Sequence, residues 1–301
     1  MFKEIELQDK EIFRHYLQGG SNKTDMANFT SLFLWKDWGG HTTWDIINGA
    51  LVVRKTYKDE LFHFCPIAPD KDTVTDTIKL LIRDALQKNE PLKFTEINEE
   101  QKNFILEACP TCFRLTENRA AADYIYNVSD LINLPGRAYG SKRNHINKFM
   151  RTYTDYELRE ITEAELPLCK EYIHKWAEDH YNHDDPHFQG EFRGTLQALE
   201  HFTKLDVKGL CLFVNGKMEG FTIGEELNPD TVLIHIEKAS ANIDGAYTLL
   251  NREFLARCWS GYQFVNREED MGMPGLRKAK ESYHPVRLEM TFGLELKREA
   301  E

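Results

Sequence analysis

YQFVNREEDMGMPGLRKAKESYHP, residues 262–285, is the stretch that decides the fold. Its opening, Tyr262-Gln263-Phe264-Val265, is typical of a short buried strand. Polar side chains follow, Gly272 and Pro274-Gly275 form a turn, and Leu276 to Tyr283 reads as a helix. A strand end, a glycine turn and a helix start together favour an anionic ligand, because free backbone N–H groups and the helix dipole point there. The pattern alone equally fits an ordinary helix start with surface charges.

The composition fits a folded protein with one large domain or two. The chain has 301 residues, of which 41% are hydrophobic, and a formal net charge of −11. Neither half is basic, so any polyanion would need a local patch. No apolar run approaches the roughly 20 residues that span a bilayer, and the N-terminus lacks a secretory signal. Six scattered cysteines are typical of reduced thiols, and we expect a cytoplasmic protein.

The order of predicted elements repeats along the chain. Asn48-Gly49 and Asn215-Gly216 each lie between apolar runs and predict hairpins. Each half reads as strand, two helices, hairpin, strand, helix, strand, helix, strand, which indicates an internal duplication. We predict a first domain over residues 1–130, a linker over 131–140 and a second domain over 141–301. Within them, for example, we expect strands at 61–67, 124–128, 231–237 and 262–265 and helices at 73–87, 142–153, 246–258 and 276–283.

A resemblance to a known family begins in the same stretch. Asn266-Arg267-Glu268-x-Asp270-x-Gly272-x-x-Gly275-Leu276-Arg277-Lys278-Ala279-Lys280-x-Ser282-Tyr283-x-Pro285 resembles the closing motif of the phosphatidylglycerol lysyltransferase C-terminal-like family, which are DUF2156-type proteins. Residues 221–225, 235–239 and 142–149 resemble three further segments of that family. The resemblance covers most of the chain and is clearest from about residue 137. It implies an α/β fold with a mixed sheet, built as two tandem GNAT-type acyltransferase domains, and the predicted order of elements agrees.

The resemblance also implies where the reaction would occur. In a GNAT-type fold two neighbouring central strands part, and the acyl donor and the amine acceptor meet there. The strands ending at Glu237-Lys238 and at Asn266-Arg267-Glu268 should be those neighbours. That would gather Lys238, Asn266, Glu268 and Asp270 at one edge. Glu268 or Asp270 would bind and deprotonate an ammonium, and Lys238 would steady a phosphate or an oxyanion; mutual pairing of strand-end charges is the alternative.

Residues of the following helix and loop are the expected donor site. Arg277 and Lys280 are three residues apart, share a helix face and suit an anion. Tyr283 is a candidate proton donor to the leaving group, or a packing residue. The candidate residues for binding substrate or donor are Asn266, Arg267, Gly275, Leu276, Arg277, Lys280, Gly245, Arg143 and Lys148.

The helix that carries Lys142, Arg143, Lys148 and Arg151 is the one concentrated cationic segment. It could hold the acceptor end of a tRNA through its phosphates, or it is a solvated helix paired with acidic neighbours. An acetyl-CoA enzyme would place a glycine-rich loop at residues 239–246, where this chain has only Gly245-Ala246. Pro66 to Asp70 occupies the equivalent place in the first half, so we expect that half to be a scaffold.

No metal site is predicted. Cys109-Pro110-Thr111-Cys112 is a lone CxxC without a second pair of ligands, so we interpret its thiols as core or turn residues. His180-Tyr181-Asn182-His183-Asp184-Asp185-Pro186-His187 matches no standard spacing, and we interpret it as a surface loop or as part of an acceptor pocket.

Three functions stay open on the sequence. We expect first an acyltransferase or aminoacyltransferase, resembling the catalytic half of aminoacyl-phosphatidylglycerol synthases. Its donor would be an aminoacyl-tRNA or an acyl thioester used as a co-substrate, with no tightly bound cofactor. Its acceptor would be a soluble small-molecule or peptide amine or a hydroxyl, because no membrane span is evident. Acetyl-CoA-dependent N-acetylation and a non-catalytic module that binds small molecules or RNA are the alternatives.

Overall fold

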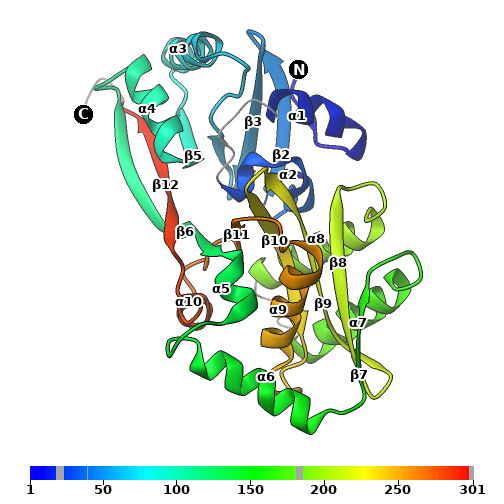
Figure 1. Ribbon diagram of the computed structural model, residues 1–301. Coiled ribbons are helices and arrows are strands. Elements are labelled where there is room, and N and C mark those ends of the chain that lie inside the picture. Colours follow the sequence, from blue (N-terminus) through cyan, green and yellow to red (C-terminus); the bar gives the residue numbers. More distant parts are fainter. Residues whose placement is uncertain (18–23, 39, 181–185, 298–301) are drawn as a thin grey trace. The chain divides into compact units, whose positions relative to one another are not determined.

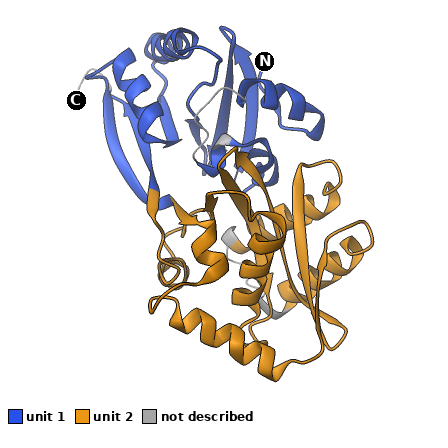
Figure 2. Ribbon diagram, viewed as in Figure 1, with its two compact units in different colours: residues 1–122, 289–301 blue, residues 123–288 orange. Residues whose placement is uncertain are grey.

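The chain folds into two compact units, which we describe separately in a computed structural model (Figures 1 and 2). The structure describes residues 1–17, 24–38, 40–180 and 186–297. Unit 1 comprises Met1–Ala122 and Glu289–Glu301, and unit 2 comprises Asp123–Leu288. The units therefore meet in sequence at 122/123 rather than within the predicted 131–140 linker, and the last strand belongs mainly to unit 1.

Unit 1 is a mixed sheet with helices. Its strands are β1 (Lys3–Glu4), β2 (Gly40–Ile47), β3 (Ala50–Tyr57), β4 (Glu60–His63), β5 (Lys93–Ile97), most of β12 (Arg287–Leu296) and the first part of β6 (Phe113–Asn127), hydrogen-bonded in the order β1-β2-β3-β4-β5-β12-β6. Two short 3-10 turns, η1 (Leu7–Asp9) and η2 (Asp25–Ala27), accompany the helices α1 (Lys10–Leu17), α2 (Phe29–Leu34), α3 (Lys71–Lys88) and α4 (Glu99–Ala108). Because β12 pairs antiparallel with β5, the final strand returns to this unit.

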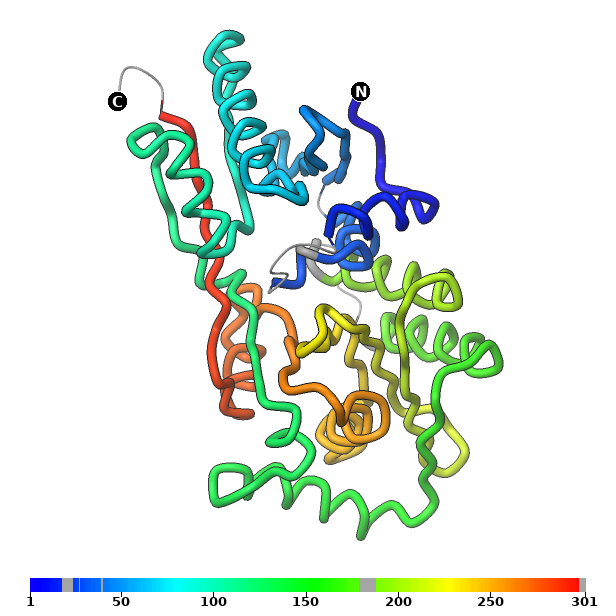
Figure 3. The backbone as a smooth tube through the Cα atoms, turned by 45° about the horizontal axis from the view of Figure 1, so that its top comes forward, coloured from blue at the N-terminus to red at the C-terminus, as the bar shows by residue number. Residues whose placement is uncertain are grey.

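Unit 2 carries a sheet in the order β6-β11-β10-β9-β8-β7. Its elements are α5 (Val128–Asn133), α6 (Gly140–Thr152), β7 (Tyr156–Glu160), α7 (Leu166–His180), α8 (Pro186–Glu200), β8 (Val207–Val214), β9 (Lys217–Asn228), β10 (Thr231–Ala239), α9 (Ala246–Cys258), β11 (Phe264–Asn266) and α10 (Pro274–Glu281). The pairs β7–β8, β8–β9, β9–β10 and β11–β6 are antiparallel, whereas β10 and β11 are parallel. The crossover from β10 through α9 to β11 runs from yellow to orange in Figure 3.

Local chemistry explains most element boundaries. Both predicted Asn-Gly hairpins form: Asn48 and Gly49 have φ of 52° and 80°, and Asn215 and Gly216 have φ of 50° and 74°. Both central residues of such a turn need positive φ, which asparagine and glycine tolerate. Helices α5, α6 and α9 lie together on one face of the unit 2 sheet, and α7 packs on β9 and against α8 (Figure 1). The core between the sheet and α9 includes Tyr124, Phe149, Leu212, Leu250 and Val265.

Candidate functional site

The two strands predicted to be neighbours are adjacent, and they part. The parallel register runs through Thr231↔Phe264, Val232↔Val265 and Leu233↔Asn266. Beyond Leu233, β10 keeps its pairing with β9, whereas β11 ends at Asn266. The next residue, Arg267, donates its backbone N–H to the carbonyl of Tyr124 on β6, 3.0 Å away. After Leu233, β10 is therefore linked to the segment that follows β11 through side chains rather than through the strand pairing.

One bridge is His235, between two carboxylates. The β9–β10 register is irregular between Ile234 and Ile236, and such a bulge re-aims the side chain at its centre. His235 Nε2 lies 2.8 Å from Glu225 Oε1, and Nδ1 lies 3.2 Å from Glu268 Oε1. Burial of the fully enclosed ring would lower its pKa, but the hydrogen bonds to Glu225 and Glu268 outweigh burial and raise the pKa to about 9. His235 is therefore an imidazolium at neutral pH, and we call Glu225, His235 and Glu268 the His235 cluster.

The second bridge joins Glu237 to Arg267. Arg267 Nη2 donates to Glu237 Oε1 at 2.9 Å, and Asn251 Nδ2 on α9 donates to Glu237 Oε2 at 3.0 Å. The guanidinium also lies over the rings of Tyr283, 4.7 Å away, and Tyr126, 5.6 Å away. Burial would lower the pKa of Arg267, but the charge of Glu237 outweighs it and keeps the pKa above its usual value. We call Glu237, Asn251 and Arg267 the Arg267 cluster.

The loop after β11 is held from three directions. Asn266, fully buried, accepts from the backbone N–H of Glu268 at 2.7 Å and donates to Asp123 Oδ2 at 2.8 Å. Glu268 has a φ of 57°, which is unusual for a residue with a side chain. Lys280 Nζ donates to three consecutive carbonyls, those of Arg267, Glu268 and Glu269. These contacts stabilise the loop backbone, including the positive φ of Glu268.

Asp270 and Arg277 form a buried clamp of their own. Asp270 accepts from Tyr124 Oη at 2.6 Å, from Arg277 Nε at 2.8 Å and from the Gly272 N–H at 2.8 Å. Burial would raise the pKa of Asp270, but these hydrogen bonds lower it well below its usual range. Such a carboxylate is a poor proton acceptor at neutral pH, so these contacts argue against the predicted role of Asp270 in deprotonating an ammonium.

The anion site predicted on the face of α10 is used within the chain. Arg277 and Lys280 do share a helix face, as their spacing predicts. That face is turned to the preceding loop, so Arg277 pairs with Asp270 and Lys280 with the carbonyls. Burial lowers the pKa of Lys280 although Glu269 and Glu268 oppose the shift. Gly275 is exposed in the first turn of α10 and Leu276 beside it is partly buried.

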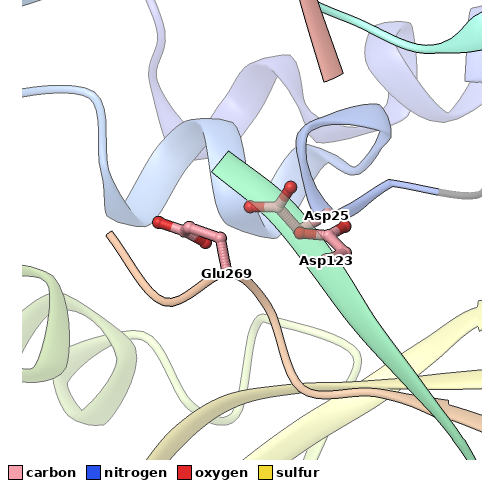
Figure 4. A group of neighbouring side chains, drawn as sticks. All are labelled: Asp25, Asp123 and Glu269. Atoms are coloured by element: carbon pink, nitrogen blue, oxygen red, sulfur yellow. The ribbon is translucent and has the colours of Figure 1, made fainter. Parts of the chain in front are cut away.

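Two carboxylates missed by the sequence reasoning lie beside the loop. Figure 4 shows Asp123 on β6 and Glu269 on the loop after β11. Burial raises the pKa of Glu269 to about 8, and the nearby charges of Glu268 and Asp123 act in the same direction. Glu269 follows Glu268 directly in the motif, so its place at a strand end could have identified it. Asp123 lies outside the segments that resemble the family, whereas Glu225 and His235 lie within two of them, 221–225 and 235–239, but no role was predicted for either residue.

Lys238 is not gathered with Glu268 and Asp270, contrary to our expectation. It forms an ion pair with Glu191 on α8, and its ammonium lies 4.0 Å from the ring centre of Trp176 on α7. Side chains alternate along a strand, so Lys238 points to the α7–α8 face while Glu237 meets Asn251 on α9. The alternative pairing of Lys238 with Glu268 is not seen either.

Tyr283 lies in the core beside the Arg267 cluster. Its hydroxyl is 3.4 Å from Thr248 Oγ1, and Lys142 Nζ on α6 lies 3.6 Å from its ring centre. Burial raises the pKa of Tyr283. The role of Tyr283 as a proton donor stays a prediction. The structure shows that its ring packs against two cations, Lys142 and Arg267.

The other cations predicted on α6 have partners in the chain. Arg143 donates to the carbonyls of Leu134 and Gly136, and Lys148 pairs with Asp244. Gly245, with a φ of 84°, begins α9, and an added Cβ there would lie 2.5 Å from the carbonyl oxygen of His145. Helix α6 thus packs directly on the place where a CoA pyrophosphate was considered.

The cysteine and histidine predictions have different outcomes. Cys109 and Cys112 are joined in a disulfide, which corrects the expectation of reduced thiols, because the CxxC turn brings the two Cα atoms to 5.5 Å. Cys65, Cys169, Cys211 and Cys258 are free. The His180–His187 loop lies largely outside the described residues. Across residues 1–17, 24–38, 40–180 and 186–297, no helix combines the length and apolarity that a bilayer span requires.

A parallel pair of strands that part beside a crossover helix defines the class: the fold is that of GNAT-type acyltransferases. Solved structures agree. A tandem GNAT protein from the clavulanic acid biosynthesis pathway shares the fold alone, at 10% identity, with a TM-score of 0.50 over 99% of both chains. The chain belongs to the family described as phosphatidylglycerol lysyltransferase, C-terminal, whose model matches residues 20–294.

Two further structures and one sequence relative extend this result. A conserved protein of unknown function from Bacteroides thetaiotaomicron is 34% identical, with a TM-score of 0.89 over 98% of this chain and 99% of that one. L-PGS from Bacillus licheniformis is 15% identical, with a TM-score of 0.68 over 98% and 93%. An uncharacterised protein of Mycoplasmoides gallisepticum is 24% identical over 172 residues; the match spans 56% of this chain and about half, 54%, of that relative.

Proposed function

We propose that the protein transfers an acyl or aminoacyl group from an activated ester to an amine or hydroxyl acceptor where β10 and β11 part. The observation that carries the proposal is His235, whose two ring nitrogens lie within hydrogen-bond distance of Glu225 and Glu268 at that point. Its charge fixes the carboxylate of Glu268 beside Glu269. A pair of carboxylates on one short loop suits a cationic amine, which a GNAT-type reaction needs as its nucleophile.

The residues support a simple division of labour. Glu268, oriented by His235, would bind the acceptor ammonium. The ammonium first releases one proton to solvent, and Glu269, whose pKa of about 8 lies near neutral pH, would take a second proton from the amine nitrogen as it attacks the ester carbonyl. A C–N bond forms, the ester C–O bond breaks, and the proton on Glu269 passes to the departing alkoxide. A hydroxyl acceptor would lose its proton to the same carboxylate.

The surroundings of α9 favour an ester donor over acetyl-CoA. An acetyl-CoA enzyme needs open backbone N–H groups at this helix start. Here Asp244 is held by Lys148 and by His145 Nδ1 at 3.1 Å, and α6 packs against Gly245. An aminoacyl ester, such as the acceptor end of a charged tRNA, does not require that place.

A transfer assay tests the proposal. Purified full-length protein is incubated with isotope-labelled aminoacyl-tRNAs and a panel of amines and hydroxyl compounds, and products are identified by mass spectrometry. We expect transfer in the wild type and at least about a hundredfold slower transfer in Glu268→Gln and Glu269→Gln. Glu281→Gln, an exposed glutamate on α10, is the matched control.

Two outcomes would replace the proposal. Product formed from acetyl-CoA but not from aminoacyl esters would favour N-acetylation. No product from either donor, while acceptors still bind the wild type and not Glu268→Gln, would make the site a binding module.

A further inference from the structure

Two thiols of unit 2 are in contact in the core. Cys169 lies on α7 and Cys211 lies on β8, so the two residues belong to different elements. Their sulfur atoms are 3.5 Å apart, and both residues are fully buried. The fold therefore brings two reactive groups together that are 42 residues apart in the sequence.

The backbone is held on both sides of this contact. At the start of α7, the Glu165 carboxylate accepts from the backbone N–H and the hydroxyl of Thr162, at 3.0 and 2.6 Å. On β8, Cys211 pairs with Arg159 of β7 on one side and with Phe221 of β9 on the other. Because a capped helix and an inner strand carry the two thiols, the sulfur atoms stay close as long as unit 2 is folded.

Helix α7 is also fixed against the sheet one turn further on. The ring centre of Tyr172 lies 6.0 Å from that of Phe221 on β9, and the Tyr172 hydroxyl donates to the carbonyl of Glu219 at 3.2 Å. Tyr172 and Cys169 are three residues apart and therefore share a helix face. That face is turned to the sheet, which sets the rotation of α7 so that Cys169 meets Cys211.

Only a small movement separates this contact from a covalent bond. Sulfur atoms in a disulfide are about 2.0 Å apart, so the two thiols would have to approach by about 1.5 Å. The contact with Cys169 and then burial raise the pKa of Cys211, which therefore keeps its proton at neutral pH. Because the thiolate is the reactive form, we expect Cys169 to react first with an oxidant.

We propose that Cys169 and Cys211 are a latent disulfide pair, which hydrogen peroxide converts into a covalent link between α7 and β8. The Cys169 sulfur attacks one peroxide oxygen, the O–O bond breaks, and a sulfenic acid and one water form. The Cys211 sulfur then attacks the sulfenic sulfur, the S–S bond forms, and the hydroxyl leaves as a second water with the thiol proton. The two thiols lose two electrons and the peroxide gains them. The inference is independent of the transfer reaction.

Peptide mapping of the full chain tests whether the link forms. The protein is treated with hydrogen peroxide, remaining thiols are alkylated in denaturant, and the chain is digested with trypsin without reduction. We expect peptide 160–170, which carries Cys169, to be joined to peptide 209–217, which carries Cys211. Cys258 on α9 is partly exposed, so its loss of alkylation shows that the oxidant has acted.

Two results of this experiment would overturn the proposal. One is recovery of both peptides unlinked, as alkylated thiols or as sulfinic acids, after Cys258 has been oxidised. The other is a link between copies of the chain, which a mixture of ¹⁵N-labelled and unlabelled protein reveals as joined peptides of mixed isotopic mass.

Thermal unfolding measures the consequence of the link. A disulfide that closes a loop of this length restricts the unfolded chain, so oxidation should raise the unfolding midpoint of unit 2 by about 5–10 °C. Cys258→Ala should show the same rise, and Cys211→Ala should show none. Methionine oxidation affects all three proteins alike, and circular dichroism confirms that each is folded. Equal shifts in the wild type and Cys211→Ala would contradict a link between α7 and β8.

Discussion

Lys280 should contribute more to the stability of unit 2 than any exposed lysine of the same helix. Its ammonium donates to the carbonyls of Arg267, Glu268 and Glu269. The Glu268 carbonyl has a second donor in the Tyr124 N–H, 3.2 Å away. Lys280→Met keeps the aliphatic stem, so the expected loss comes from the remaining two carbonyls.

The magnitude follows from the cost of buried acceptors left unpaired. Leaving two buried carbonyls unpaired costs about 1–3 kcal/mol each, or about 2–6 kcal/mol together. Part of this cost is offset, because the variant no longer has to bury a charged ammonium. We expect Lys280→Met to lower the free energy of unfolding by about 3 kcal/mol. Lys278→Met, two residues away and exposed, should stay within about 0.5 kcal/mol of the wild type.

Hydrogen exchange of the Tyr124 and Arg267 amides, which join the loop to β6, measures the effect where it arises. Urea denaturation of the full chain gives the global value. Lys280→Arg is the second variant, since a planar guanidinium cannot reach three consecutive carbonyls as an ammonium does. If Lys280→Met costs less than about 1 kcal/mol, the three contacts are not what holds this loop, and our account of the motif fails.

Three further predictions concern protonation and redox state. Because the pKa of His235 is raised, its contribution to stability is complete below about pH 6.5 and is lost as the pH rises through about 9. The free energy of unfolding should therefore fall by about 3 kcal/mol between these two pH values. His235→Asn should abolish this fall. The lowered pKa of Asp270 has the opposite sign: its contribution is present above about pH 4 and is lost in acid, so denaturation of Asp270→Asn should depend less on pH below about 4 than that of the wild type. Alkylation of the unfolded, unreduced chain should modify four cysteines and spare Cys109 and Cys112, and modification of all six would refute the disulfide.

Sequence patterns predicted elements well because the signals are local. The Asn-Gly turns, the 3.6-residue period of α3 and the glycine turn after β11 each depend on a few adjacent residues. The length of β6 escaped prediction for the same reason. Residues 113–123 include Arg114, Glu117 and Arg119, whose polar character conceals a strand that is stabilised by pairing with distant segments.

The site was harder to predict because partners far apart in sequence decide it. Arg277 and Lys280 were correctly placed on one helix face, but the ligand of that face is the chain's own loop. Lys238 sits at the predicted strand end and points to the other face, since one residue of register reverses a side chain. His235 and Glu225 are 10 residues apart on adjacent strands, and no spacing rule connects them.

These contacts divide the family motif into two kinds of residue. Asn266, Asp270, Arg277 and Lys280 are occupied with the backbone and with each other, so they build the loop. Glu268 and Arg267 are presented by that loop, the first to His235 and the second to Glu237. A loop held this firmly, with a positive φ at Glu268, keeps a carboxylate and a guanidinium in place before any substrate arrives. The motif therefore imposes the geometry, and β10 supplies His235 and Glu237, which these two side chains contact.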